Sequence, residues 1–226
     1  TLLQTRPGNA GLRLLLGAAY FQLKDLPKAK ASVEHAILID PKTRDAYSLL
    51  AEIDLAQGSA EQAKKDLRKA IEADPQNVKN YLELSAQYEK DKNWSEARKL
   101  CEKAREIDPS NALVANELAY LYLDHGGDIN AAVSLAQVAR QKMPSSAYAA
   151  DTLGWAYYKL GSSASAVREL KDSVQKSPNN PLFQYHLGMA YLATRNYDSA
   201  GRCLQKALQE DPRFPYAASA KQALGT

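Results

Sequence analysis

The residues that could perform chemistry in this sequence are few and widely spaced. The three histidines, His35, His125 and His186, are separated by 90 and 61 positions, and no cysteine lies next to any of them. A zinc site needs ligands that converge on one point, and short Cys and His spacings usually supply them. We therefore predict no metal site and no bound cofactor.

A short stretch with paired glycines, DHGGD at residues 124–128, is the one segment that resembles a ligand loop. It lacks the alternating carboxylates of a calcium loop. It also lacks the Lys and Ser or Thr that follow the glycines of a phosphate-binding loop. No activated serine or Cys–His pair accompanies it. We interpret it as a lengthened turn and expect a chain that is not an enzyme.

The two thiols, Cys101 and Cys203, are too few for the disulfide framework of a small secreted domain. A free cysteine behaves as a small apolar residue in a protein core. We expect both to be reduced and buried.

The densest group of aromatic residues lies in DTLGWAYYKLG at residues 151–161. With 100° per residue in a helix, Trp155 and Tyr158 share a face with Tyr148, whereas Tyr157 lies on the face of Leu153. The pattern predicts that Tyr157 is core. Trp155 and Tyr158 have two interpretations: they are anchors for a partner, or neighbouring helices or a terminal cap cover them.

The elements that must position these residues follow a regular period. Seven prolines recur at intervals of 34 or 35 residues, most of them after a Lys- and Glu-rich amphipathic stretch, at positions 7, 41, 75, 109, 144, 178 and 212. Proline disfavours helical geometry in the preceding residue, so each one indicates a helix end. A short polar turn divides each interval into two helical runs, and the single 35-residue interval contains residues 124–128. The turn there is expected to hold the extra residue.

Each unit also repeats the same small and large residues. The first helix carries pairs such as Leu153-Gly154 and Leu187-Gly188, followed by a tyrosine such as Tyr157, and the second carries alanines such as Ala29 and Ala166. This pattern resembles the tetratricopeptide repeat family. The resemblance implies an all-α fold, a right-handed superhelix of six helix-turn-helix repeats with a C-terminal capping helix. The expected parts are a tail of a truncated preceding repeat at 1–9, repeats at 10–43, 44–77, 78–111, 112–146, 147–180 and 181–214, and a capping helix at 215–226.

One position departs from the pattern, because the second unit has Asp54 where other units have tyrosine. A buried carboxylate without a partner is costly. We expect either a partner for Asp54 in an adjacent helix or a loosely packed seam at residues 45–56.

In the resembled family, one face of the first helices lines a concave groove that binds protein segments. Projected onto this sequence, that face gives a candidate peptide-binding site with aromatic residues and polar handles: Glu52, Glu89, Asn116, Tyr120, Tyr148, Asp151, Trp155, Tyr158, Tyr185, His186 and Met189. Exposed aromatic side chains in a groove are common anchors for peptides. We expect a protein or peptide ligand that is apolar or amphipathic, with a basic residue facing Glu52, Glu89 or Asp151. A carboxylate clamp is not expected, since the positions where that branch of the family has lysine hold other residues here.

Composition limits the alternatives. The chain has 226 residues, 45% hydrophobic and 24% charged, with a net charge of +3, which favours a folded chain without the concentrated basic surface of nucleic-acid binders. No segment is apolar for the length of a membrane span. We predict a non-catalytic protein-interaction scaffold that binds no nucleic acid. The alternatives are the docking arm of a larger enzyme such as a transferase, and an RNA-binding helical repeat.

The ends of the sequence carry further expectations. The segment before residue 10 ends in a repeat-type proline, so we expect the protein to continue upstream, and exposed repeat ends allow self-association. The later repeats are similar to those of bacterial envelope-associated proteins, including proteins linked to exopolysaccharide export. That resemblance favours the cell envelope over the cytoplasm.

Overall fold

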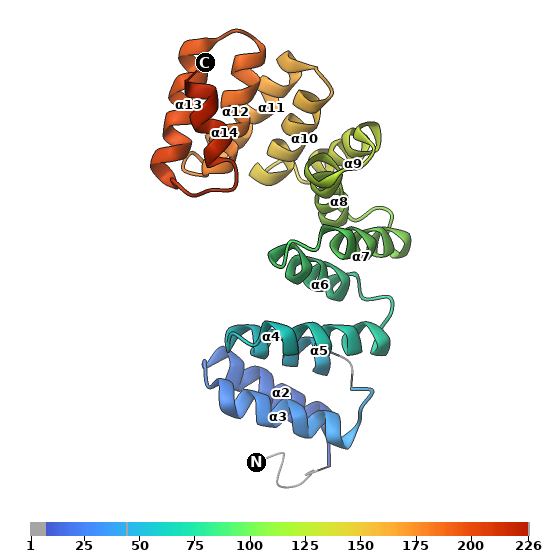
Figure 1. The fold of residues 1–226 in the computed structure, drawn as a ribbon. Coiled ribbons are helices and arrows are strands. Elements are labelled where there is room, and N and C mark those ends of the chain that lie inside the picture. The colour runs from blue at the N-terminus through green and yellow to red at the C-terminus, as the bar shows by residue number, and fades with distance from the viewer. Residues whose placement is uncertain (1–7, 44, 226) are drawn as a thin grey trace. The chain divides into compact units, whose positions relative to one another are not determined.

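The computed structural model describes residues 8–43 and 45–225, and every regular element in these ranges is an α-helix (Figure 1). The expected all-α fold is thus confirmed. The part of the expected N-terminal tail at residues 1–7 lies outside the described residues. The helices are α2 Ala10–Gln22, α3 Leu26–Ile39, α4 Ala46–Ala56, α5 Ala60–Ala73, α6 Val78–Lys90, α7 Trp94–Ile107, α8 Ala112–His125, α9 Ile129–Lys142, α10 Ala147–Lys159, α11 Ser163–Lys176, α12 Pro181–Ala193, α13 Tyr197–Glu210 and α14 Ala217–Leu224.

Short polar side chains start most of these helices. Asn111 and Asn180 each accept hydrogen bonds from two backbone N–H groups of the following first turn, at 2.9 to 3.3 Å. Such caps satisfy donors that have no partner inside the helix. At the other end, α3, α5, α7, α9, α11 and α13 all stop two residues before a proline of the periodic series, as the sequence predicts.

The turn inside each helix pair contains one residue with positive φ, and this conformation follows the repeat period. The residues are Lys24, Gly58, Lys92, Gly126, Gly161 and Arg195, with φ between 59° and 84°. The next helix begins two residues later in five cases and three residues later after Gly126. The extra residue of the 35-residue interval is therefore in this turn, as predicted.

The chain divides into two compact units, one ending at Asp108 and the other beginning at Pro109. In the first unit, α2 to α7 pack as consecutive helix pairs, and Ala29, Val33, Leu50 and Ile53 form a buried cluster. The backbone of Gly17 allows close packing, because an added Cβ there would lie 2.5 Å from Val33. Small residues at such crossings let helix axes approach closely.

Asp54 is fully buried in this first unit, and Lys30 of α3 forms an ion pair with it. The prediction that Asp54 finds a partner in an adjacent helix is confirmed. Burial raises the pKa of the neighbouring Asp66, whose carboxyl accepts a hydrogen bond from Gln62 at 2.9 Å.

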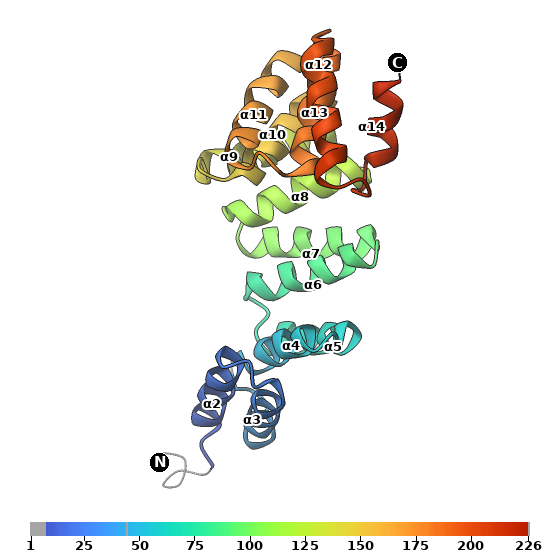
Figure 2. The same cartoon turned by 90° about the vertical axis from the view of Figure 1, so that its left-hand side faces the viewer.

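The second unit contains α8 to α14 and repeats the same packing (Figure 2). An added Cβ at Gly154 would lie 2.5 Å from Leu170, and one at Gly188 would lie 2.8 Å from Leu204. Tyr157, predicted as core, is half-buried and packs against the edge of the cluster that contains Leu170 and Leu187. The first helices of the pairs are also neighbours, since α10 contacts both α8 and α12.

The sequence predicts that both thiols are reduced and buried. Both cysteines are free, with Cys101 fully buried and Cys203 half-buried. Burial raises the pKa of the Cys203 thiol.

Within residues 8–43 and 45–225, no helix combines the length and the apolar character that a membrane crossing requires.

Candidate functional site

The second unit contains an aromatic cluster, which we define as Trp155, Tyr158, Tyr185, His186, Phe214 and Tyr216. Trp155 is central to it. Its ring stacks with Tyr158 at 4.6 Å between centroids and 7° between planes, and with His186 at 4.0 Å and 13°. The Lys159 ammonium lies 4.9 Å from the Trp155 ring centroid, where a cation–π interaction is favourable. Only 3% of Trp155 remains exposed.

Asp124, at the end of α8, connects this cluster by two hydrogen bonds. The indole Nε1 of Trp155 donates to Asp124 Oδ1 at 2.8 Å, and the hydroxyl of Tyr216 donates to Asp124 Oδ2. Burial and the hydrogen bond to Asp124 strongly raise the pKa of Tyr216, so its phenol stays protonated as a donor. One carboxylate therefore joins α8, α10 and the residues just before α14.

Asp151 of α10 and His186 of α12 form a buried polar pair, and the His186 ring stacks on that of Trp155. His186 Nδ1 and Asp151 Oδ2 are 2.9 Å apart, and His186 is 1% exposed. Burial raises the pKa of Asp151, and the hydrogen bond with His186 opposes that rise. Asp151 Oδ1 and His186 Nε2 have no hydrogen-bond partner among the described residues. His186 lies among the rings of Trp155, Tyr185 and Tyr216, so the pair has almost no contact with the protein surface.

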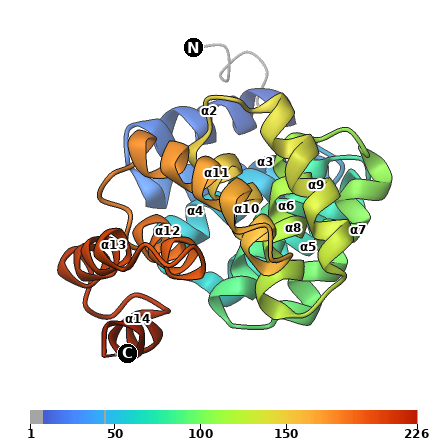
Figure 3. The same cartoon turned by 90° about the horizontal axis from the view of Figure 1, so that it is seen from above.

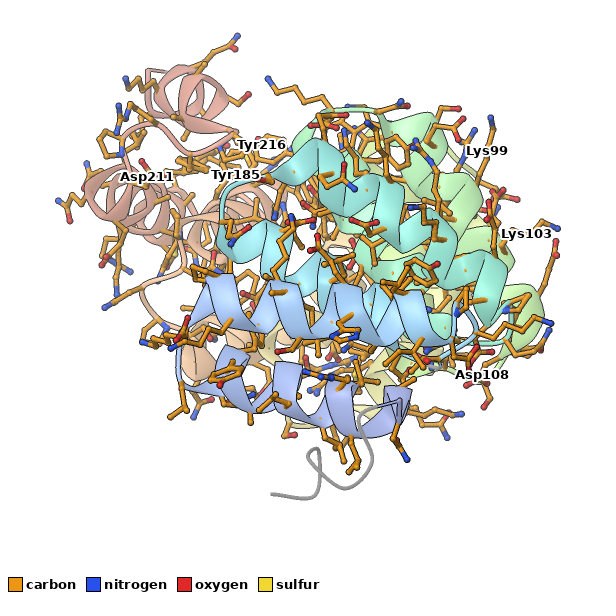
Figure 4. All side chains as sticks on the ribbon, turned by 90° about the horizontal axis from the view of Figure 1, so that it is seen from below. Lys99, Lys103, Asp108, Tyr185, Asp211 and Tyr216 are labelled. Carbon is orange, nitrogen blue, oxygen red and sulfur yellow. The ribbon has the colours of Figure 1, made fainter. Side chains whose placement is uncertain are left out.

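The C-terminal segment, residues 211–216, links α13 to α14 and completes the cluster (Figure 3). Phe214 is 3% exposed, with its ring 5.8 Å from that of Tyr185. Tyr216 stacks on Tyr185 at 4.9 Å and 11°, and Figure 4 shows these two side chains together. Tyr185 is 5% exposed, and this burial raises the pKa of its phenol.

The predicted groove residues of this unit fall into two groups. Four of them, Asp151, Trp155, Tyr185 and His186, are buried, so the expectation of an open aromatic groove at these positions is wrong in this arrangement. The C-terminal segment and the stacked rings cover them, which is the second interpretation of the sequence pattern. The other predicted residues of this unit remain accessible to solvent: Asn116, Tyr120, Tyr158 and Met189 are partly exposed, and Tyr148 is exposed.

Tyr148 is the most accessible of the predicted residues. It is 64% exposed, and its ring meets the buried ring of Phe183 edge-on at 5.2 Å. One side of the phenol is therefore fixed by α12 while the other remains open to solvent. A side chain held in this way loses little conformational entropy when it contacts a ligand.

In the first unit, the predicted acidic handles already have partners within the chain. Lys79 donates to Glu52 at 2.7 Å and lies 3.3 Å from Glu83, and burial raises the pKa of Glu83. Ser85 donates to Glu89 at 3.4 Å. The sequence predicts a partner's basic residue at this position, but the chain supplies Lys79 itself.

The basic residues of α7 are balanced by acids one turn away. Lys99 pairs with Glu96 and Lys103 with Glu106, each at 2.6 Å, and Figure 4 shows both lysines extending away from the helix. Interleaved charges of this kind are typical of a solvated face.

Among the described residues, no group of three or more His, Cys, Asp or Glu side chains is placed to hold a metal ion. The predicted groove residues do not include Asp124, Phe214 and Tyr216, three members of the site network. The sequence pattern places Asp124 at a turn, and the signal for the C-terminal segment is Phe214 between Pro212 and Pro215, with Tyr216 directly after it.

Comparison with known proteins agrees with this architecture. A family model described as tetratricopeptide repeat matches residues 1–53, 54–119 and 163–224. A search of curated proteins finds no match. Among solved structures, a chain of the APC/C hetero-tetramer Cut9–Hcn1 is 22% identical with a TM-score of 0.74; the match covers 99% of this chain and 44% of that one.

Two smaller proteins are matched over most of their length. PilF of Pseudomonas aeruginosa is 18% identical with a TM-score of 0.73, covering 94% of this chain and 96% of PilF. YrrB, described as a protein of this repeat type with an unusual peptide-binding site, is 20% identical with a TM-score of 0.65, covering 84% and 97%. Because the family model covers most of the sequence, this chain belongs to the tetratricopeptide repeat family.

Proposed function

We propose that this chain is a non-catalytic protein-interaction scaffold that binds a peptide or helical segment of a partner on the second unit. The contact surface is the part of the predicted groove in this unit that remains accessible, with Tyr148 exposed and Tyr120, Tyr158 and Met189 partly exposed. Family membership supports the scaffold role, and the peptide-binding site described for YrrB supports a short segment as the ligand.

The observation that carries this proposal is the 64% exposure of Tyr148 next to the buried ring of Phe183. Large aromatic residues dominate the energetics of binding hot spots because they bury much area with few rotatable bonds. The buried ring of Phe183 holds one side of Tyr148 in place, which lowers the entropic cost of docking.

A peptide ligand for this surface should be apolar or amphipathic. Glu52 and Asp151, two of the acids expected to attract a basic residue, are paired within the chain with Lys79 and His186. Satisfied charges give little net attraction to a further charge. Ligand affinity should therefore depend weakly on salt, in contrast to RNA binding.

The test is selection of ligands from a random peptide library, followed by affinity measurements on single variants. Tyr148→Ala should weaken the selected peptides by about tenfold or more, which corresponds to the loss of a hot-spot side chain. Tyr197→Ala is the matched control, since Tyr197 is 66% exposed but lies outside the predicted groove. Equal affinities for the two variants would refute the proposal.

Trp155→Ala is a poorer test of binding. Trp155 is buried and hydrogen-bonded to Asp124, so its removal would disturb packing as well as any surface. A loss of binding there would not separate recognition from folding.

A further inference from the structure

The C-terminal segment at residues 211–216 docks on α12 through its aromatic side chains. It contains no helix, yet it places Phe214 and Tyr216 against the ring of Tyr185. Pro212, Arg213 and Pro215 between and beside them are exposed. The backbone makes two consecutive turns here, with Phe214 N–H donating to Asp211 O at 3.4 Å and Ala217 N–H to Phe214 O at 2.9 Å, and these turns direct the two aromatic side chains inward.

The contacts of Tyr216 extend beyond what is needed to cover the last helix pair. The helix that follows, α14, packs on α13. The Tyr216 hydroxyl instead donates to Asp124 of α8, a residue 92 positions earlier, which also accepts from Trp155 of α10. The segment thus contacts the first helices α8 and α12 directly, and Asp124 connects it to Trp155 of α10, on the surface where this family is expected to bind its ligands.

We infer that the C-terminal segment is an intramolecular occupant of a partner site, and that a partner segment with a Phe-Pro-Tyr-like sequence takes its place. This inference rests on the proposed function and adds the partner's chemistry and its control. The site is closed while residues 214–216 occupy it and opens when a partner segment displaces them.

The site geometry defines what the partner must carry. One aromatic ring takes the position of Phe214 beside Tyr185, and a second takes the position of Tyr216. The second ring needs a hydroxyl donor, because Asp124 presents a carboxylate that accepts from Trp155 and Tyr216. A proline between the two rings has a fixed φ, which reduces the conformational entropy that the segment loses on binding.

Covalent connection makes the internal segment a strong competitor. A tethered segment has an effective concentration in the millimolar range when its linker is short. The apparent affinity for an external segment is reduced by the fraction of molecules in which the site is open. Weakening the internal contacts should therefore strengthen external binding, the opposite of the usual effect of damage to a binding protein.

The test uses the full chain and a fluorescein-labelled hexapeptide, Pro-Arg-Phe-Pro-Tyr-Ala, which copies residues 212–217. Fluorescence anisotropy should show about tenfold tighter binding to Tyr216→Phe than to the wild type, since a hydrogen bond to a charged group is lost only from the internal segment. Phe214→Ala should act in the same direction. Arg213→Ala, with an exposed side chain, is the matched control and should bind like the wild type.

A second arm tests the required hydroxyl. The hexapeptide with Phe in place of Tyr should bind the Tyr216→Phe protein about tenfold more weakly than the original. Adding Asp124→Ala to Tyr216→Phe should remove the preference for the tyrosine peptide. Circular dichroism melting shows which variants are folded; if Phe214→Ala does not fold, Tyr216→Phe still decides.

The inference is overturned if the wild type and Tyr216→Phe bind the hexapeptide equally, or if the two peptides bind Tyr216→Phe equally. Its failure is distinguishable from failure of the proposed function. Library ligands that require Tyr148, together with a hexapeptide that does not bind, would retain the scaffold proposal and reject the internal occupant. Hexapeptide binding without any Tyr148-dependent ligand would reject the proposed Tyr148 surface and retain the internal occupant.

Discussion

The hydroxyl of Tyr216 and the indole N–H of Trp155 donate to the two oxygens of the same carboxylate, Asp124. This shared acceptor satisfies the indole N–H of Trp155, which is why the ring can be 3% exposed without leaving a buried donor unpaired. The Trp155 ring is fixed by a polar bond at its edge and by stacked neighbours on its face. Its position is determined by the fold of the unit and not by a ligand.

Replacing Trp155 with Phe should destabilise the protein by about 2 kcal/mol, because it removes a hydrogen bond to a charged group and leaves a small cavity. Urea denaturation measures the change in the free energy of unfolding. Tyr148→Phe provides the control on the same helix, with an expected change within about 0.5 kcal/mol for an exposed site. A Trp155→Phe protein as stable as the wild type would show that the bond to Asp124 contributes nothing.

Gly154→Ala should destabilise the second unit by about 1 to 3 kcal/mol, because the new methyl group overlaps the buried side chain of Leu170. Gly201 lies in α13 with nothing within 4 Å of an added Cβ. Gly201→Ala should therefore stabilise the protein by about 0.5 to 1 kcal/mol through helix propensity. Thermal melting of the two variants should shift in opposite directions; parallel shifts would contradict the packing role of Gly154.

Removing the charge of Lys30 and removing the charge of Asp54 should lower the free energy of unfolding by different amounts. Lys30→Met leaves the fully buried Asp54 without its cation and should cost about 3 kcal/mol. Asp54→Asn should cost less, because the Lys30 ammonium is 29% exposed and can recover hydration. Equilibrium unfolding in urea compares the two. The reverse order would mean that Asp54 is satisfied by other groups.

Residues 45–56 should also exchange their amide hydrogens slowly. A paired Asp54 predicts a tightly packed seam, and well-packed helices open with free energies near that of global unfolding. Hydrogen exchange followed by mass spectrometry measures this directly. Exchange as fast as that of the chain ends would contradict the pairing.

The Asp151–His186 pair predicts a pH-dependent stability. Burial raises the pKa of Asp151, so the folded state binds a proton on this carboxyl more tightly than the unfolded chain does. The stability gained in acid is lost as the pH rises through the folded-state pKa. The free energy of unfolding of Asp151→Asn relative to the wild type should therefore increase as the pH rises above about 4, the usual pKa of Asp. A relative decrease would mean that the folded protein favours the ionised form of Asp151.

The sequence by itself determined the repeating elements of this protein, because their causes are local. Prolines end the second helices, polar residues cap the following ones, and Gly–Leu pairs such as Gly154 and Leu170 set the spacing of helix crossings. Each of these effects acts within one repeat or between neighbours. A period of 34 residues therefore predicts them without coordinates, including the extra residue in the turn after Gly126.

Only the tertiary structure decided which face residues stay accessible. The periodicity placed Trp155, Tyr158 and Tyr148 on one face of a helix but could not show that Tyr216 and Phe214 return to cover part of it. It likewise could not show that Lys79 neutralises Glu52. These contacts join residues 27 to 92 positions apart, and their formation depends on how separate helices pack, which no local pattern of side chains specifies.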